Sequence, residues 1–248
     1  MASLAQFDRR RGAERPGVVG VDEAGRGSLC GPVVAAAVLL DAGFYGEKSW
    51  LRKVAGADDS KRLTAERRAE LRAAVGELQS AGRLRCAWAS ASVLEISAHN
   101  ILGATRLAMA RCVAALAQGP LAPLFAAAGT EGELFGHGEG RTFLVLVDGL
   151  PLRPFAWAHE AVKGGDGKSL AIALASIVAK VERDRLLVEM DARHPEYGFA
   201  VHKGYGTPDH IEALRRLGPC PEHRDLFVRR ILAGEEQPPE AQDEFSFE

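Results

Sequence analysis

Two apolar runs near the N-terminus predict neighbouring strands of a sheet. The first extends from about Val18 to Glu23 and ends among glycines, which indicate a turn at Gly25 and Gly27. The second covers residues 32–40 and follows closely enough to pair with the first as a hairpin. Further apolar runs predict strands at residues 84–91 and 142–147.

Helical spacing of apolar positions dominates the segments between and after these strands. It is clearest at residues 99–116, where apolar residues recur at intervals of three and four. Thr64 is suited to cap a helix that continues to about residue 78, and Asp166 stands where a long helix to about residue 190 is predicted to begin. Two shorter helices are predicted at residues 207–217 and 224–232. Strands and helices in this order predict an α/β fold with helices covering the faces of a sheet.

Both ends of the chain and one internal stretch depart from this pattern. Residues 1–15 are polar and rich in Arg, and they predict a flexible arm. Residues 118–140 are rich in Gly, Ala and Pro, which indicates a loop insertion within a main domain at 16–190. A helical appendage is predicted at 191–232 and a disordered acidic tail at 233–248.

Composition narrows the class of protein. The chain has 248 residues, of which 47% are hydrophobic and 26% charged, enough for one sizeable core. It lacks the apolar segment of a signal peptide, and its apolar runs are too short to span a bilayer, so we expect a cytoplasmic protein with no membrane partner. The net charge is −2, but residues 234–248 contain six acids and no base, which leaves +4 for the remainder and allows a basic face.

The cysteines and histidines give no sign of a metal site or a disulfide framework. No two of the four cysteines, at positions 30, 86, 112 and 220, have a CxxC spacing, so reduced and partly buried thiols are expected. None of the seven histidines has a spacing typical of a metal ligand, and His223 is interpreted as structural.

Four acids lie where regular structure is predicted to end. Asp22 and Glu23 end the first strand, Asp148 ends a strongly apolar strand, and Asp166 precedes a helix. Functional groups in open α/β sheets gather at strand ends, and carboxylates without His or Cys suit hard cations such as Mg²⁺ or Mn²⁺. Two such ions can activate water and stabilise a leaving oxygen in phosphodiester hydrolysis.

Each acid also has a simpler interpretation. Asp166 can be a helix cap, and Asp148 with Gly149 can be a turn. Asp22 and Glu23 are adjacent on a strand and point to opposite faces unless the backbone bends after them. A P-loop is disfavoured, because the segment GGDGKS has Val162 where the pattern requires glycine.

Long motifs carry a resemblance to a known family. The first is GVDEAGRGSLCGPVVAAAV, which contains Asp22 and Glu23. In the same order follow DDSKRLT (58–64), HNILGATRLAMARCV (99–113), LVDGLPL (146–152), KSLAIALASIVAKVERDR (168–185), HKGYGTPDH (202–210) and HRDLF (223–227). Together these segments resemble the ribonuclease HII family over about residues 16–230. The resemblance implies a ribonuclease H-like mixed sheet flanked by helices, with residues 16–190 as the catalytic domain and a C-terminal helical appendage.

The resemblance also implies an activity and its residues. It implies cleavage of the RNA strand of RNA–DNA hybrids, and of single ribonucleotides in duplex DNA on their 5′ side, by two Mg²⁺ or Mn²⁺ ions. It assigns metal binding and catalysis to Asp22, Glu23, Asp148 and Asp166. It assigns recognition of the 2′-OH to Gly25, Arg26 and Gly27, stacking on the following deoxyribose to Tyr205, and phosphate contacts to Lys61, with Lys168 and Ser169 less directly. From the residues alone, Gly25–Gly27 would be a plain turn and Tyr205 a loop anchor. The phosphate-contacting residues would be solvated surface groups.

The chain departs from the family pattern in two places, and two alternative functions stay open. The family usually has one glycine before the helix-start Asp, whereas Gly164 and Gly165 both precede Asp166 here, and residues 118–140 are longer than usual. The related ribonuclease HIII is disfavoured because only about fifteen residues precede the first strand. A non-catalytic nucleic-acid-binding relative is disfavoured by the full set of acids. In the tail, Gln242, Phe245 and Phe247 loosely resemble a sliding-clamp-binding peptide, although an accidental match is the simpler interpretation.

Overall fold

The centre of the protein is a five-stranded mixed sheet. The computed structural model describes residues 3–128 and 142–234. The strands are β1 (Gly17–Ala24), β2 (Val33–Asp41), β3 (Arg85–Ala91), β4 (Leu144–Asp148) and β5 (Glu160–Val162), in the order β3-β2-β1-β4-β5. The predicted hairpin is confirmed by the antiparallel pairing of β1 with β2, and β3 continues it. β4 and β5 instead run parallel to β1, so the carboxyl ends of these three strands share one edge.

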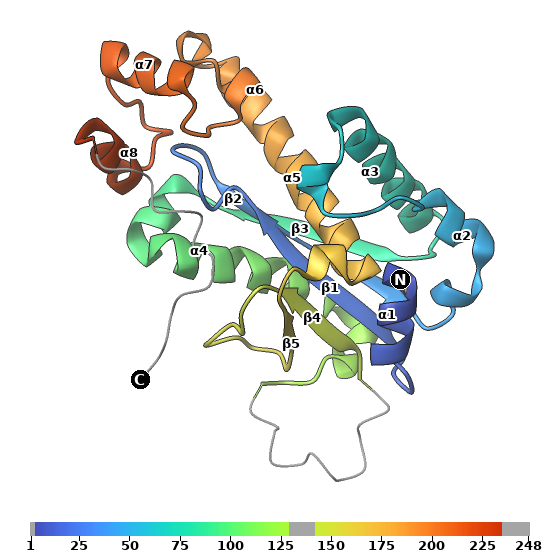
Figure 1. Cartoon of the computed structure of the whole chain (residues 1–248). Coiled ribbons are helices and arrows are strands. Elements are labelled where there is room, and N and C mark those ends of the chain that lie inside the picture. The colour runs from blue at the N-terminus through green and yellow to red at the C-terminus, as the bar shows by residue number, and fades with distance from the viewer. Residues whose placement is uncertain (1–2, 129–141, 235–248) are drawn as a thin grey trace.

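Helices cover both faces of this sheet, as the sequence predicts (Figure 1). α4 (Val93–Leu116) lies on one face, and α3 (Ala65–Ser80) and α5 (Leu170–Asp191) lie on the other. β1 alternates between two cores, with Val18 packed on the α5 side and Val19 and Val21 on the α4 side. α5 approaches β1 very closely, because a Cβ at Gly20 would lie 2.1 Å from the backbone of Ala171.

A helical appendage follows α5 and gathers at its C-terminal end (Figure 1). It contains α6 (Phe199–His202), α7 (Pro208–Leu217) and α8 (Asp225–Leu232), and Thr207 caps α7 by accepting from His210 N. The two helices predicted in this region are therefore confirmed. Their own small core includes Leu29 of the loop after β1, together with Phe199 and Leu214. The appendage is thereby packed against the loop that joins β1 to β2.

The predicted flexible arm is partly wrong. Residues 4–11 form helix α1 (Leu4–Arg11), capped by Ser3, and Leu4 and Phe7 pack against the core on the α5 side. Asp8 is fully buried and accepts hydrogen bonds from Ala171 N (2.9 Å) and from the Tyr45 hydroxyl (3.3 Å). These partners are far away in the chain, so the local sequence, which is polar and rich in Arg, did not predict the helix.

Other boundaries differ in instructive ways. α4 begins at Val93 with a capping box formed by Ser92 and Glu95, and Asn100 (φ 55°) interrupts it next to the start predicted at residue 99. In the described parts of the chain, the remaining short helices are α2 (Lys48–Lys53) and the 3-10 turns Phe44–Gly46, Ser60–Arg62, Gly119–Leu124, Gly165–Gly167 and Pro195–Tyr197. Most of the predicted insertion (129–140) and of the acidic tail (235–248) lies outside the described residues. Within the described ranges, no helix is long and apolar enough to cross a membrane.

Candidate active site

Asp22 and Asp148 lie side by side at the carboxyl ends of adjacent parallel strands. β1 and β4 pair as far as Val21 opposite Val147, so the two aspartates occupy the next position of this register. Side-chain alternation directs both toward the α5 face, because their neighbours Val18 and Leu146 pack there. The backbone thus brings two acids from segments more than a hundred residues apart to the sheet edge where ligands of α/β proteins bind.

Burial and mutual repulsion make these acids weak. Burial raises the pKa of Asp22 well above its ordinary value, and the charges of Glu23 and Asp148 raise it further. Hydrogen bonds from the Ser176 hydroxyl and from Glu23 N, at 2.7 Å, act in the opposite direction. The pKa of Asp148 is also raised, chiefly by burial, although Gly165 N donates to its Oδ1 at 2.5 Å. Carboxyls in this state favour a nearby cation, because its charge would offset both effects.

Asp166 lies beside this pair, but it does not begin the helix. It occupies the turn Gly165–Gly167, whereas α5 begins at Leu170 with Ser169 as its cap, which corrects the predicted boundary. Burial, followed by the charges of Asp148 and Asp59, raises the pKa of Asp166 to about 6. The two preceding glycines have separate structural roles: Gly164 is left-handed (φ 57°), and a Cβ at Gly165 would lie 2.5 Å from Ile172 Cδ1. The doubled glycine therefore still leaves Asp166 next to Asp148.

Glu23 makes a different contact from the three aspartates. Its carboxylate pairs with Arg26 at 3.0 Å. In the described part of the chain, the only three His, Cys or acidic side chains with ligand atoms all within 4.8 Å of one another are Cys30, His210 and His223. The four predicted acids thus do not form a single compact ligand set. This spread is compatible with a pair of ions about 3.5–4 Å apart, since ligands then divide between the ions.

The predicted substrate-binding turn is held against a buried arginine. Gly25 has φ +93°, and a Cβ there would lie 1.9 Å from Arg183 Nε, so glycine is required for both reasons. Arg26 and Gly27 follow it half-buried at the surface. Tyr205 is also half-buried, and its ring centroid lies 5.4 Å from Lys180 Nζ and 5.6 Å from Arg183 Cζ.

The predicted phosphate-binding residues differ in how accessible they are. Lys61 is exposed in the turn Ser60–Arg62, and its charge lowers the pKa of Asp148, which places it near the acids. Lys168 is exposed and donates to the carbonyl of Lys163. Ser169 is fully buried, and its hydroxyl accepts from Ile172 N as the cap of α5. Phosphate binding by Ser169 stays a prediction, and the structure does not support it, because the hydroxyl is buried and caps α5.

Two further polar residues, Asp59 and Ser176, contact the acids, and Ser60 is bonded to Ser176; none of these was singled out from the sequence. Asp59 forms a side-chain hydrogen bond with Asp166. Ser60 and Ser176 share a hydrogen bond of 2.9 Å, and Ser176 also bonds to Asp22. Asp59 and Ser60 belong to the DDSKRLT motif, so the sequence contained a signal for them. Ser176 had a weaker signal, as a polar residue in the otherwise apolar stretch LAIALASIVA.

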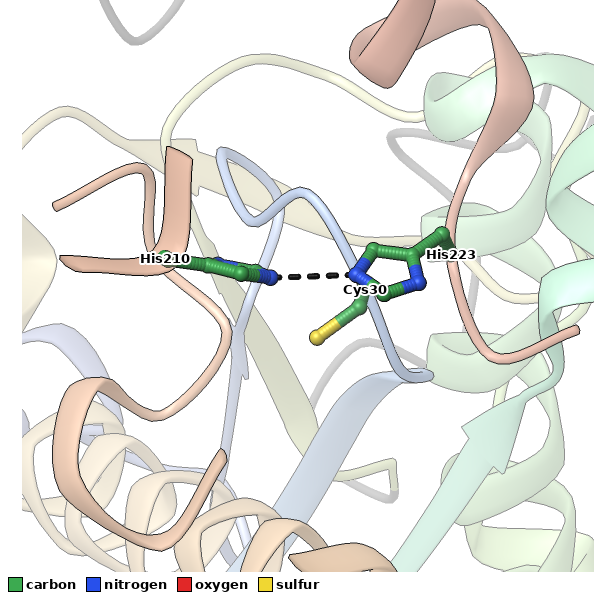
Figure 2. Close-up of side chains that lie close together, drawn as sticks. All are labelled: Cys30, His210 and His223. Atoms are coloured by element: carbon green, nitrogen blue, oxygen red, sulfur yellow. Dashed lines mark hydrogen bonds between the residues drawn. The ribbon is translucent and has the colours of Figure 1, made fainter. Parts of the chain in front are cut away.

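The cluster of Cys30, His210 and His223 joins the loop after β1 to the appendage (Figure 2). Cys220 N donates to His223 Nδ1 at 3.0 Å, so the His223 proton is on Nε2, which faces His210 Nε2 at 3.1 Å. A metal ion bound by both Nε2 atoms would need a lone pair on each of them, which would move the His223 proton to Nδ1. That proton would then point at the N–H of Cys220, which now donates to Nδ1. The charges of Arg183 and Arg224 also act on Cys30, which disfavours a cation. The hydrogen bonds therefore indicate a neutral histidine pair.

Comparison with known proteins decides the family. A family model described as "Ribonuclease HII" matches residues 19–232. The chain belongs to the ribonuclease HII family. A curated Ribonuclease HII of Rhizorhabdus wittichii is 46% identical over 211 residues, which cover 85% of this chain and 87% of that protein. This chain is accordingly an enzyme, a ribonuclease H of type HII that acts on RNA–DNA hybrids. The curated relative is also named Ribonuclease HII, which does not favour the ribonuclease HIII alternative.

Solved structures confirm the ribonuclease H-like fold. The ribonuclease HII of Archaeoglobus fulgidus, solved as a PCNA:RNase HII complex, has a TM-score of 0.59 at 22% identity and covers 87% of this chain and 93% of its own. Bst-RNase HIII in complex with Mn²⁺ has a TM-score of 0.61 at 14% identity, over 95% of this chain and 75% of its own. At these identities the likeness concerns the fold.

Proposed function

We propose that this ribonuclease HII cleaves the phosphodiester on the 5′ side of a ribonucleotide, both in RNA–DNA hybrids and where a single ribonucleotide is embedded in duplex DNA. The products would carry a 3′-OH and a 5′-phosphate. The observation that carries the proposal is the adjacency of Asp22 and Asp148, whose pKa values are raised and whose neighbours include Glu23 and, through Asp148, Asp166.

The donor set fits divalent cations. The acids supply only oxygen ligands, which suits Mg²⁺ or Mn²⁺, and their raised pKa values support the proposal because a bound cation would stabilise the ionised carboxylates. A solved relative of the same fold contains Mn²⁺. Two bound ions would supply an activated water and a stabilised leaving oxygen. Asp22, Glu23, Asp148 and Asp166 would hold them, with Ser176 and Gly165 N orienting the aspartates through hydrogen bonds.

Recognition of the substrate would come from the loops beside the acids. The backbone of Gly25–Gly27 would contact the 2′-OH, the group that distinguishes RNA from DNA, and this turn is held in place by the packing of Gly25 against Arg183. The half-buried ring of Tyr205 would stack on the sugar after the ribonucleotide and favour a junction with DNA. Lys61, and more peripherally Lys168, would contact phosphates.

Asp22→Asn tests the acid site. The change removes a charge and keeps the shape of the side chain, so the protein should fold and bind substrate. Cleavage should fall by about 10³-fold or more, because several kcal/mol of transition-state stabilisation depend on the bound ions. Asp41→Asn is the matched control, since Asp41 is exposed opposite Gly17, at the other end of β1. Cleavage by Asp22→Asn at the rate of the control would refute the site.

A second proposal concerns the tail. We propose that Gln242, Phe245 and Phe247 bind a sliding clamp, which is supported by the PCNA complex of a structural relative. Deleting residues 234–248 should abolish clamp binding in a pull-down with purified clamp and leave cleavage of a short duplex unchanged. Undiminished clamp binding after the deletion would contradict this proposal.

A further inference from the structure

The two predicted recognition elements are joined through the appendage. Leu29 N, just after the glycine turn, donates to the carbonyl of Gly204 at 2.8 Å, next to Tyr205. Arg224 N donates to the carbonyl of Leu29 at 2.8 Å, and Gly31 N donates to that of Glu222 at 2.9 Å. Residues 222–224 therefore lie against the turn, while residues 204–205 lie beside it.

Arg224 fixes the turn from inside. It is 1% exposed, and its guanidinium donates to the carbonyl oxygens of Gly31, Ser28 and Arg26 at 2.9, 2.9 and 3.0 Å. A buried cation is costly unless it is hydrogen-bonded, so these carbonyls are held around it. The turn is thus held in one conformation, and its hydrogen bond from Leu29 N to the carbonyl of Gly204 places it beside Tyr205.

The neighbouring residue, His223, begins a directed chain of hydrogen bonds to Tyr205. Cys220 N donates to His223 Nδ1, and His223 Nε2 donates to His210 Nε2 (Figure 2). The remaining His210 proton is then on Nδ1, which donates to the Tyr205 carbonyl at 2.9 Å. Burial lowers the pKa of both histidines to about 4, so both rings are neutral at physiological pH. The direction of these hydrogen bonds is fixed at one end by the Cys220 N–H, which can only donate, and at the other by the Tyr205 carbonyl, which can only accept.

A third imidazole supports the same loop. His202 stacks on His210, with ring centroids 4.0 Å apart, and its Nδ1 accepts from Gly204 N at 3.1 Å. Its Nε2 proton donates to the carbonyl of Tyr197 at 2.8 Å. The backbone on both sides of the Tyr205 peptide is therefore held by neutral histidines.

We propose that His210, oriented by His223, is a positioning residue that holds Tyr205 at a fixed place beside the glycine turn and thereby sets the preference for a ribo-to-deoxyribo junction. The inference rests on the proposed function, in which Tyr205 contacts the substrate. His210 itself is fully buried and does not touch the substrate.

Two substitutions of His210 separate this role from packing. His210→Asn keeps an N–H donor where Nδ1 stands, and so keeps the bond to the Tyr205 carbonyl. His210→Gln places its amide near the position of Nε2, so it can still meet His223 but cannot donate to Tyr205. We would measure kcat/KM for a duplex with one ribonucleotide and for a continuous RNA–DNA hybrid, and take the ratio of the two.

His210→Gln should lower this junction preference about tenfold, whereas His210→Asn should stay within about threefold of wild type, because only the Gln variant loses the hydrogen bond to the Tyr205 carbonyl. In a Tyr205→Ala background, His210→Gln should change the ratio less than about twofold, because the group it positions is gone. Leu214→Ala is the stability control: it opens the same small core without touching these hydrogen bonds. It should lower the melting temperature and leave the ratio unchanged.

The outcomes are distinguishable. Equal losses of junction preference in the Asn and Gln variants, or a further tenfold loss in the Tyr205→Ala background, would overturn the positioning role. The same holds if Leu214→Ala lowers the ratio as much as His210→Gln does. If Tyr205→Ala alone leaves the ratio at the wild-type value, junction recognition by Tyr205 fails, and the inference fails with it. Circular dichroism and thermal melts of every variant establish that each is folded at the assay temperature.

Discussion

Asp166→Asn should stabilise the protein in the absence of divalent ions. The pKa of Asp166 is raised to about 6 by burial and then by Asp148 and Asp59, against about 3.9 in an unfolded chain. Two pH units correspond to about 3 kcal/mol. Because the carboxyl is only half-buried, solvent screening reduces this to about 1–2 kcal/mol. Asn retains an oxygen to accept from Gly167 N, which bonds to Asp166 Oδ1 at 2.9 Å.

The sign of the pH dependence follows from the raised pKa. The folded state binds the proton more tightly than the unfolded state, so this group's contribution to stability is fully present below about pH 4 and is lost as pH rises through about 6. In urea titrations with chelator at pH 8, the Asn variant should therefore be more stable than wild type by about 1–2 kcal/mol, a rise in melting temperature of several degrees. Near pH 4 the difference should approach zero.

Added Mg²⁺ or Mn²⁺ should reduce or reverse the stability advantage of the Asn variant. The ions bind folded wild type more tightly than they bind the folded variant, so they stabilise wild type more. Asp41→Asn, at the opposite end of the sheet, should show neither effect. The reasoning is refuted if Asp166→Asn is no more stable than wild type at pH 8 in chelator, or if its advantage does not depend on pH.

Two further substitutions test the geometry around the site. Gly25→Ala should destabilise the protein by about 2–4 kcal/mol in urea titrations, because its φ of +93° and the Arg183 side chain 1.9 Å from the new Cβ both oppose a methyl group; wild-type stability would show that the turn is looser than described. Ser169→Ala should cost about 1 kcal/mol through loss of the α5 cap and leave kcat/KM unchanged. A large loss of kcat/KM at unchanged stability would instead restore Ser169 as a phosphate ligand.

The sheet and most helices were predictable because their signals are local. β1, β2 and β4 are buried apolar runs, and Thr64 and Thr207 are capping residues directly before their helices. The acids at strand ends could be selected for the same reason, because strand termination is visible in the sequence and parallel strands share an edge.

Features that depend on distant partners were not predictable. α1 is stabilised by burial of Leu4 and Phe7 and by the bonds of Asp8, none of which a local pattern reveals. Ser169 and Asp166 compete as caps within four residues, and only the turn at Gly165 decides between them. The bond between His210 and His223 needs the packed appendage, so their spacing in the sequence carried no signal.

The most direct test is cleavage of a DNA duplex that contains one ribonucleotide, with Mg²⁺ or Mn²⁺ and again with chelator, followed by mapping of the cut and its ends. We predict cutting on the 5′ side of that ribonucleotide, with 3′-OH and 5′-phosphate products, and none with chelator. Cutting that persists in chelator, falls elsewhere, or is confined to long RNA–DNA hybrids would contradict the proposed roles of the four acids, the Gly25–Gly27 turn or Tyr205, respectively.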